Sequence, residues 1–239
     1  MTVKIKKIDL SNIDTVILAG GFGTRLRGLI DDKPKCMAKI NGKPFIDILI
    51  DKCMDQRLKR FIICVGYLKE QVIEHLDTRN DCKIIYSKEE IPLGTGGAVK
   101  NTEGNILSKD FFVINGDSYS EMDFASMLMS HKNNKGVITI GIAKQSDSTD
   151  FGTVTFNKSL RITGFSEKGK FKNEYINAGV YLFKTDVFKI MPKKQTFSIE
   201  KDFFEKIYED QSCYVFTKID NFIDIGTKQR YYSAHENIN

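Results

Sequence analysis

A glycine-rich segment followed closely by cations is the first part of the sequence whose residue types indicate chemistry. The glycines are Gly20, Gly21 and Gly23, and the cations behind them are Arg25, Arg27, Lys33 and Lys35. Glycines let backbone N–H groups converge on an anion, and the cations suit the charge of a triphosphate. The spacing fits neither the dinucleotide-binding motif, because Leu26 replaces its third glycine, nor the Walker loop, because Leu29 replaces its lysine. We predict a phosphate-binding loop; the alternative is a tight turn that only carries the chain out of a strand.

Two aspartates provide a second chemical signal. Asp117 and Asp224 each end an apolar run and have a glycine nearby. Carboxylates are ligands that a hard divalent cation prefers, although an Asp after Asn-Gly is more often a turn former. If both bind one cation, we expect them to repel each other in its absence, so that Asn at either position spares the stability of the metal-free protein. The histidines, His75, His131 and His235, lie outside every motif and are predicted to be structural or surface residues.

Short apolar runs predict the strands that must position these residues in the first half of the chain. We expect strands over Thr15–Ala19, Phe61–Val65, Cys82–Tyr86 and Phe111–Ile114. Helical spacing covers Phe45–Met54 and Glu70–Leu76, and another helix is expected to start after the glycines that end at Gly97. Such alternation predicts a mostly parallel sheet flanked by helices, with ligands at the carboxyl ends of its strands.

The second half of the chain has a different pattern, which predicts a smaller, mixed and more antiparallel part. Short strands are expected at 137–143, 153–156, 160–165 and 176–183, then an amphipathic helix at 197–208 and extended pieces at 214–218 and 222–225. Because no linker or repeat interrupts the chain, we predict a single α/β domain over 1–239, with one half at roughly 14–135 and the other at 136–239.

Composition excludes several classes of protein. The chain has 239 residues, 41% of them hydrophobic, and a formal net charge of +5. No apolar stretch approaches the roughly 18 residues that span a bilayer, and no signal peptide precedes the first strand, so we expect a cytoplasmic protein. The Cys count of 5 is odd and includes no C-x-x-C pair, which favours reduced, buried thiols. The absence of basic runs argues against nucleic-acid binding.

Several segments together resemble the signature of the sugar-1-phosphate nucleotidylyltransferases. LAGGFGTRL at 18–26 and the KPKCM that begins at Lys33 are followed, in family order, by LGTGGA at 93–98, VINGD at 113–117, FSEK at 165–168, NAGVYLF at 177–183 and DIGT at 224–227. The resemblance implies the nucleotide-diphospho-sugar transferase fold, which is Rossmann-like. It also implies that the two halves bind nucleotide and sugar phosphate, respectively.

The resemblance also implies roles for individual residues. Arg25 and Lys35 would be catalytic, and Asp117 and Asp224 would bind Mg²⁺. Nucleotide binding would involve Leu18, Ala19, Gly20, Gly21, Gly23, Thr24, Arg25, Gly94, Thr95, Gly96 and Gly116. Sugar-phosphate binding would involve Gly152, Glu167, Lys168, Asn177 and Gly179, with Lys168 on the phosphate.

Within the family, the sequence looks most similar to the bacterial D-glycero-D-manno-heptose 1-phosphate guanylyltransferases. This implies the transfer of a guanylyl group from GTP to D-glycero-α-D-manno-heptose 1-phosphate by a monomer or homodimer, for surface polysaccharide synthesis. The alternatives are a mannose-1-phosphate guanylyltransferase, a relative that uses UTP, CTP or dTTP, and a catalytically silent regulatory subunit. A silent subunit would have no need of the two aspartates.

The sequence departs from the family pattern in three places. Cys36 and Lys39 stand where relatives often have proline, which makes Lys39 a candidate for a further phosphate contact. Phe222 stands where relatives often have Trp. The chain also ends soon after Thr227, so we expect no carboxy-terminal β-helix and no second activity.

Overall fold

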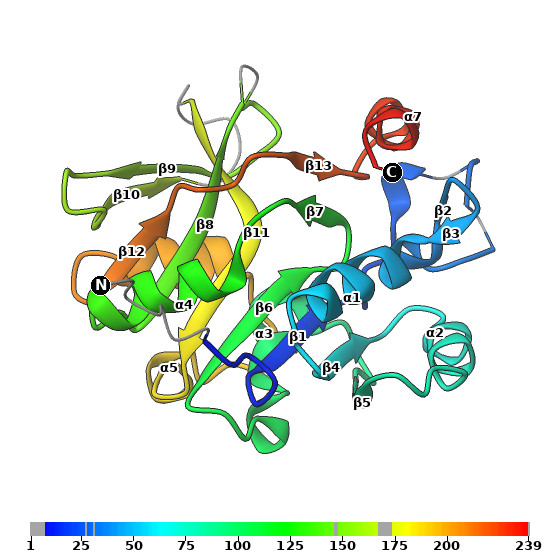
Figure 1. Cartoon of the computed structure of the whole chain (residues 1–239), viewed down its shortest axis with the longest axis horizontal. Coiled ribbons are helices and arrows are strands. Elements are labelled where there is room, and N and C mark those ends of the chain that lie inside the picture. The colour runs from blue at the N-terminus through cyan, green and yellow to red at the C-terminus, as the bar shows by residue number, and fades with distance from the viewer. Residues whose placement is uncertain (1–7, 27, 31, 146–147, 167–173, 239) are drawn as a thin grey trace, which may run out of the picture.

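A single nine-stranded sheet forms the centre of the molecule (Figure 1). The computed structural model describes residues 8–26, 28–30, 32–145, 148–166 and 174–238. The strands run in the order β10-β9-β11-β6-β1-β4-β5, with β8 paired to both β11 and β12. Their bounds are β1 Asp14–Leu18, β4 Arg60–Val65, β5 Lys83–Lys88, β6 Asp110–Asn115, β8 Ile138–Lys144, β9 Thr153–Phe156, β10 Ile162–Ser166, β11 Tyr175–Lys184 and β12 Cys213–Phe216.

The four strands that the first half contributes to this sheet are parallel, whereas those of the second half are mixed. Strand β1 pairs in parallel with β4 and β6, and β4 pairs in parallel with β5. Strand β11 is antiparallel to both β6 and β8, and β9 is antiparallel to β10. The predicted fold class is therefore confirmed, including the change of pattern in mid-chain.

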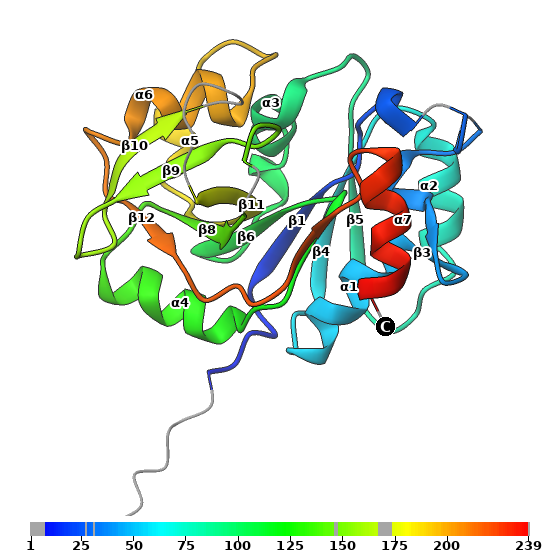
Figure 2. The ribbon, with the colours of Figure 1, turned by 90° about the horizontal axis from the view of Figure 1, so that it is seen from above.

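Helices cover both faces of the sheet, as Figure 2 shows. Because successive residues of a strand point to opposite faces, Ile17 and Val16 belong to different apolar clusters. The Ile17 face packs against α1 (Phe45–Asp55), α2 (Lys69–Leu76) and α4 (Phe124–Asn133). The Val16 face packs against α3 (Gly94–Lys100), α5 (Val187–Ile190) and the π-helix Ile199–Phe204, which continues into α6 (Glu205–Ile207).

Smaller elements surround the carboxyl end of β6. Strand β7 (Ser118–Ser120) pairs with β13 (Phe222–Asp224), and β2 (Lys39–Ile40) pairs with β3 (Lys43–Pro44). Helix α7 (Lys228–Asn237) follows β13 and packs against residues of β2 and α1 in a third cluster that includes Ala234, Ile40 and Phe45. Near the end of the chain, α7 therefore returns to the first half of the protein.

Two expectations differ from the structure. The helix predicted at 197–208 begins only at Ile199, because the Phe197 carbonyl accepts N–H groups from Gly96 and Gly97. The Ser198 side chain caps the helix by accepting the Lys201 amide. The glycines at 94–97 form the first turn of α3 rather than preceding it. Within the described residues, no helix combines the length and apolar character that a membrane span requires.

Candidate active site

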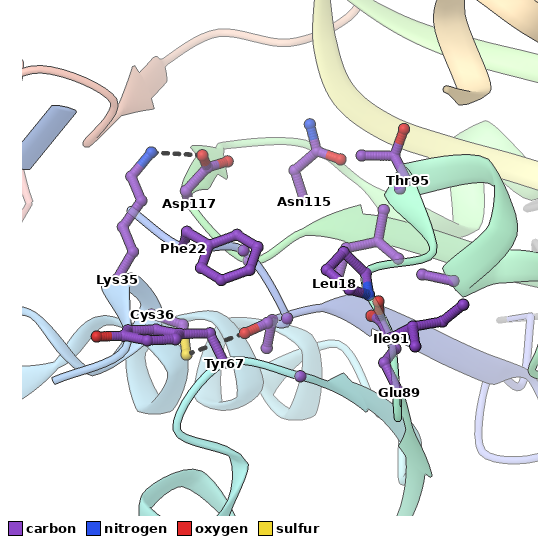
Figure 3. Close-up of a pocket in the computed structure, with 18 of the residues that line it drawn as sticks. Leu18, Phe22, Lys35, Cys36, Tyr67, Glu89, Ile91, Thr95, Asn115 and Asp117 are labelled. Atoms are coloured by element: carbon purple, nitrogen blue, oxygen red, sulfur yellow. Dashed lines mark hydrogen bonds and ion pairs between the residues drawn. The ribbon is translucent and has the colours of Figure 1, made fainter. Parts of the chain in front are cut away.

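A cavity of about 440 Å³ opens at the carboxyl ends of β1, β4, β5 and β6, where a parallel sheet is expected to bind its ligand (Figure 3). Its wall is formed by the glycine-rich loop, by the segments that follow these strands and by the start of α3. The residues that line it are Leu18, Ala19, Gly20, Gly21, Phe22, Lys35, Cys36, Gly66, Tyr67, Glu89, Glu90, Ile91, Pro92, Gly94, Thr95, Ala98, Asn115, Gly116 and Asp117. Most of the predicted nucleotide-binding residues are therefore brought together on one cavity.

Two glycines allow the chain to pack closely around the glycine-rich loop: Gly116, which follows β6, and Gly23 in the loop itself. A Cβ at Gly116 would lie 2.5 Å from the Leu18 carbonyl oxygen, to which the Gly116 amide donates at 3.0 Å. Gly23 has a φ of +61°, which a residue with a side chain rarely adopts, and a Cβ there would lie 3.0 Å from the Lys35 side chain. The loop therefore stays close to both β6 and Lys35.

Lys35 and Asp117 form an ion pair in the cavity wall, with 2.5 Å between Nζ and Oδ2. Lys35 lies in a short 3-10 helix at 35–37, and its side chain is only 12% exposed. Burial opposes ionisation of Asp117, but the Lys35 ammonium, a hydrogen bond from Ser118 and the charge of Arg25 together lower the pKa of the carboxyl. Asp117 is therefore a carboxylate at neutral pH.

Arg25 and its neighbours lie at the edge of the site. Arg25 is exposed and does not line the cavity, although its charge reaches Asp117. Gly23 is likewise outside the cavity lining, and the Thr24 side chain and Arg27 lie outside the described residues. Lys39 is exposed on β2, where its carbonyl accepts the Tyr231 hydroxyl.

The fold places the two predicted metal ligands next to each other. Asp224 is paired in register with Ser118, and the Ile225 amide donates to the Asp117 carbonyl at 3.0 Å. Asp117 directly precedes β7 and Asp224 ends β13, so their backbones are neighbours, and carboxylates are the oxygen ligands that Mg²⁺ prefers. These two residues would hold the ion.

The structure gives each of these carboxylates its own cation, which the expected repulsion did not take into account. Asp117 is paired with Lys35, and Asp224 accepts two contacts from Arg230 Nη1 at 3.1 and 3.2 Å. Replacing either aspartate by Asn would remove an ion pair from the metal-free protein. Its stability is therefore expected to fall somewhat rather than to stay the same.

The predicted sugar-binding residues Gly152, Asn177 and Gly179 are adjacent in the second half. The Asn177 amide donates to the Gly152 carbonyl at 2.8 Å, and the Asn177 Oδ1 accepts the Gly179 amide at 3.0 Å. Glu167 and Lys168, the other two predicted residues, lie outside the described residues.

Glu200 is a further candidate for sugar binding that sequence reasoning missed. Its carboxylate accepts a hydrogen bond from Asn177 Nδ2, and both of its oxygens lie 3.4 Å from the position of a Cβ at Gly152. The carboxylate therefore lies between two predicted sugar-binding residues. Its position at the start of a helix gave no chemical signal in the sequence.

Gly96 forms a packing contact in the structure, whereas the resemblance implies that it binds nucleotide. It is buried and absent from the cavity lining, and a Cβ there would lie 2.2 Å from the Phe197 ring. Its amide donates to the Phe197 carbonyl at 3.0 Å. In this structure Gly96 is required for packing between α3 and the segment before the π-helix.

Two polar residues of the cavity were also missed. Glu89 follows β5, and its Oε2 accepts the Leu93 amide at 3.0 Å, while its Oε1 lies against Gly20. Burial raises the pKa of Glu89, and the hydrogen bond from Leu93 partly offsets this. Asn115 has a buried Oδ1 with no hydrogen-bond partner among the described residues. Both stand at the carboxyl end of a strand, and this position is the signal that points to them.

The parallel strands, the glycine-rich loop and the lysine and carboxylate pair form a cavity of the kind in which α/β proteins bind phosphorylated ligands. The chain belongs to the nucleotidyl transferase family, which matches residues 14–239. It is 35% identical over 221 residues to a D-glycero-alpha-D-manno-heptose 1-phosphate guanylyltransferase of Campylobacter jejuni, covering 92% of this chain and 97% of that protein.

Two further relatives support the same grouping. The crystal structure of HddC from Yersinia pseudotuberculosis superposes with a TM-score of 0.84 at 34% identity, covering 95% of this chain and 100% of that one, and HddC has also been solved complexed with GMP-PN. A mannose-1-phosphate guanylyltransferase of Mycobacterium tuberculosis is 32% identical over 92% of this chain, but this match covers only 62% of that longer protein.

Proposed function

We propose that this protein transfers a guanylyl group from GTP to D-glycero-α-D-manno-heptose 1-phosphate and releases pyrophosphate. The observation that carries the proposal is the cavity itself, in which the glycine-rich loop, Lys35 and Asp117 meet at the ends of parallel strands. The heptose-specific relative matches this chain over nearly its whole length, which favours the heptose over other sugars.

In the proposed reaction, an oxygen of the sugar phosphate attacks the α-phosphorus of GTP. The bond from that phosphorus to the oxygen that bridges to the β-phosphorus breaks, and pyrophosphate leaves with the electron pair. Both reactants are anions, so the site must supply fixed positive charge. Lys35 and Arg25 supply it, and amides of the loop at 20–23 bind the phosphate oxygens.

Asp117 and Asp224 would hold Mg²⁺, which when bound neutralises phosphate charge and polarises the α-phosphoryl group. In the free protein Lys35 is bound to Asp117. If Asp117 bound the ion, the Lys35 ammonium would be released from this pair and could bind phosphate. The same side chain therefore serves in both states of the site.

The position of Glu89 supports GTP as the nucleotide. Guanine presents adjacent N–H donors on its Watson–Crick edge, whereas the pyrimidine bases present a carbonyl oxygen beside a single donor or acceptor. A carboxylate accepts hydrogen bonds and donates none. Because Oε2 already accepts the Leu93 amide, we infer that Oε1, which lies against Gly20, is the oxygen that accepts from the purine edge.

Recognition of the sugar would involve both donors and acceptors of the second half. Asn177, Gly152, Gly179 and Glu200 would bind sugar hydroxyls, and Lys168 would bind the phosphate with Glu167 beside it. The protein would act in the cytoplasm as a monomer or homodimer. Its product would be a precursor for the synthesis of a surface polysaccharide. The two halves of the chain, 14–135 and 136–239, would divide the two substrates between them.

A panel of pyrophosphate-release assays tests this proposal. GTP, UTP, CTP and dTTP are each combined with heptose 1-phosphate or mannose 1-phosphate, with and without Mg²⁺. The proposal predicts the highest kcat/KM for GTP with the heptose and no release when the sugar or the metal is omitted. A higher kcat/KM with mannose 1-phosphate would identify the mannose enzyme, and no release in any combination would favour the regulatory subunit.

A further inference from the structure

Arg230 connects three segments that are far apart in the sequence. From the first turn of α7, its Nη1 contacts both oxygens of Asp224 and its Nη2 forms an ion pair with Asp150. The guanidinium also lies 4.5 Å from the centroid of the Phe151 ring, and that ring packs edge-on against Phe222. The Asp224 side chain is 9% exposed and the Arg230 side chain 28%, whereas Asp150 is 52% exposed, so the Asp224 side of the cluster is the buried one.

With Arg230, each of the two metal-ligand candidates has a cationic partner. Lys35 neutralises Asp117 and Arg230 neutralises Asp224, so neither carboxylate carries an uncompensated charge without a metal. The two pairs differ in one respect. Lys35 lines the nucleotide cavity, whereas Arg230 does not and has a second carboxylate, Asp150, as a partner.

We propose that Arg230 is the counter-ion of Asp224 in the metal-free enzyme and competes with the divalent cation for that carboxylate. This inference rests on the proposed function only in taking Asp117 and Asp224 as the metal ligands. A guanidinium next to a carboxylate repels a dication that approaches the same oxygens. Free enzyme therefore binds the cation weakly, and tight binding requires the phosphate oxygens of the nucleotide as additional ligands.

Asp150 and Phe151 give the Arg230 guanidinium partners that do not depend on Asp224, so its charge would stay paired if Asp224 bound a cation. If Asp224 bound a cation, Arg230 would keep its ion pair with Asp150 and its contact with the face of the Phe151 ring. Asp150 and Phe151 directly precede Gly152, a predicted sugar-binding residue. Arg230 is therefore a positioning residue that links the metal carboxylate to the sugar side of the site.

The test measures Mn²⁺ binding to nucleotide-free protein by electron paramagnetic resonance, which counts the free ion directly. Mn²⁺ takes the same oxygen ligands as Mg²⁺. Arg230→Gln removes the charge but keeps a hydrogen-bond donor, and we expect it to bind Mn²⁺ at least tenfold more tightly than wild type. Arg230→Lys keeps the charge and is the matched control, with an expected affinity within about threefold of wild type.

Unchanged or weaker Mn²⁺ binding by Arg230→Gln would overturn the proposal, as would equal tightening in the Lys variant. If circular dichroism shows that the Gln variant does not fold, Arg230→Met is measured in its place under the same criteria. Pyrophosphate release by wild-type protein is measured separately. Its absence would refute the proposed function, while the Mn²⁺ titrations would still decide the role of Arg230.

Discussion

Replacing Glu89 by glutamine tests how the cavity selects its nucleobase. In the wild type, Oε2 accepts the Leu93 amide, and we propose that Oε1, which lies against Gly20, accepts from guanine. Glutamine has only one acceptor oxygen, so either the Leu93 amide or the base would face an NH₂ group instead. A hydrogen bond to a charged group contributes about 1.5 to 3 kcal/mol. Its loss lowers kcat/KM for GTP by roughly 10- to 150-fold.

The same change affects a pyrimidine nucleotide differently. Uracil presents carbonyl oxygens beside one N–H group, so the neutral amide of glutamine pairs with it at least as well as a carboxylate does. We therefore expect kcat/KM for UTP to stay constant or to rise, and the preference for GTP over UTP to narrow by at least tenfold.

The assay is initial-rate pyrophosphate release with heptose 1-phosphate at saturation and each nucleotide varied. Glu103→Gln is the control, because Glu103 lies in an exposed turn after α3 and is not in the cavity lining. An unchanged ratio of the GTP and UTP values in Glu89→Gln would refute the assignment of the base to this carboxylate.

Three other perturbations have defined outcomes. Arg25→Ala should lower kcat about a hundredfold, or about 3 kcal/mol, as expected for one charge-stabilising donor; near-normal kcat would make Arg25 a surface cation only. Glu200→Gln should raise KM for the sugar phosphate at least fivefold in initial-rate assays while KM for GTP changes less than twofold, and equal effects on both would point to a structural role. Burial lowers the pKa of His131 from 6.5 to about 4. Between these two pH values the unfolded chain protonates His131 more readily than the folded protein does, so the free energy of unfolding should fall by at most about 3 kcal/mol as the pH drops from 6.5 to 4. Urea unfolding of His131→Gln should show a flatter pH dependence, and an equally steep one would exclude His131 as the cause.

The central strands and the glycine-rich loop could be predicted because the chain itself carries their signals. Phe61–Val65 and Phe111–Ile114 are continuous apolar runs, as strands buried on both faces require. Helix α7 has no comparable signal, because Ala234 is its only buried residue within 228–237. Its position depends on tertiary packing against Ile40 and Phe45, which local sequence does not encode.

The site residues likewise fall into those that a local motif predicts and those that only the tertiary fold brings to the site. Asp117 and Lys35 lie in recognisable motifs, and the structure joins them in an ion pair. Glu200 and Arg230 take part only because the fold brings them to Gly152 and Asp224, respectively, so no pattern of neighbouring residues identifies them. The repulsion expected between Asp117 and Asp224 did not include their counter-ions, because Lys35 and Arg230 come from other segments of the chain.

The formation of a GDP-sugar tests the central claim most directly. Purified protein is incubated with GTP, D-glycero-α-D-manno-heptose 1-phosphate and Mg²⁺, and the products are quantified by chromatography and mass spectrometry. We predict one GDP-heptose for each pyrophosphate released, with neither product formed when the sugar phosphate is omitted. Release of pyrophosphate or phosphate from GTP without the sugar phosphate, or no GDP-heptose in the complete mixture, would contradict the account.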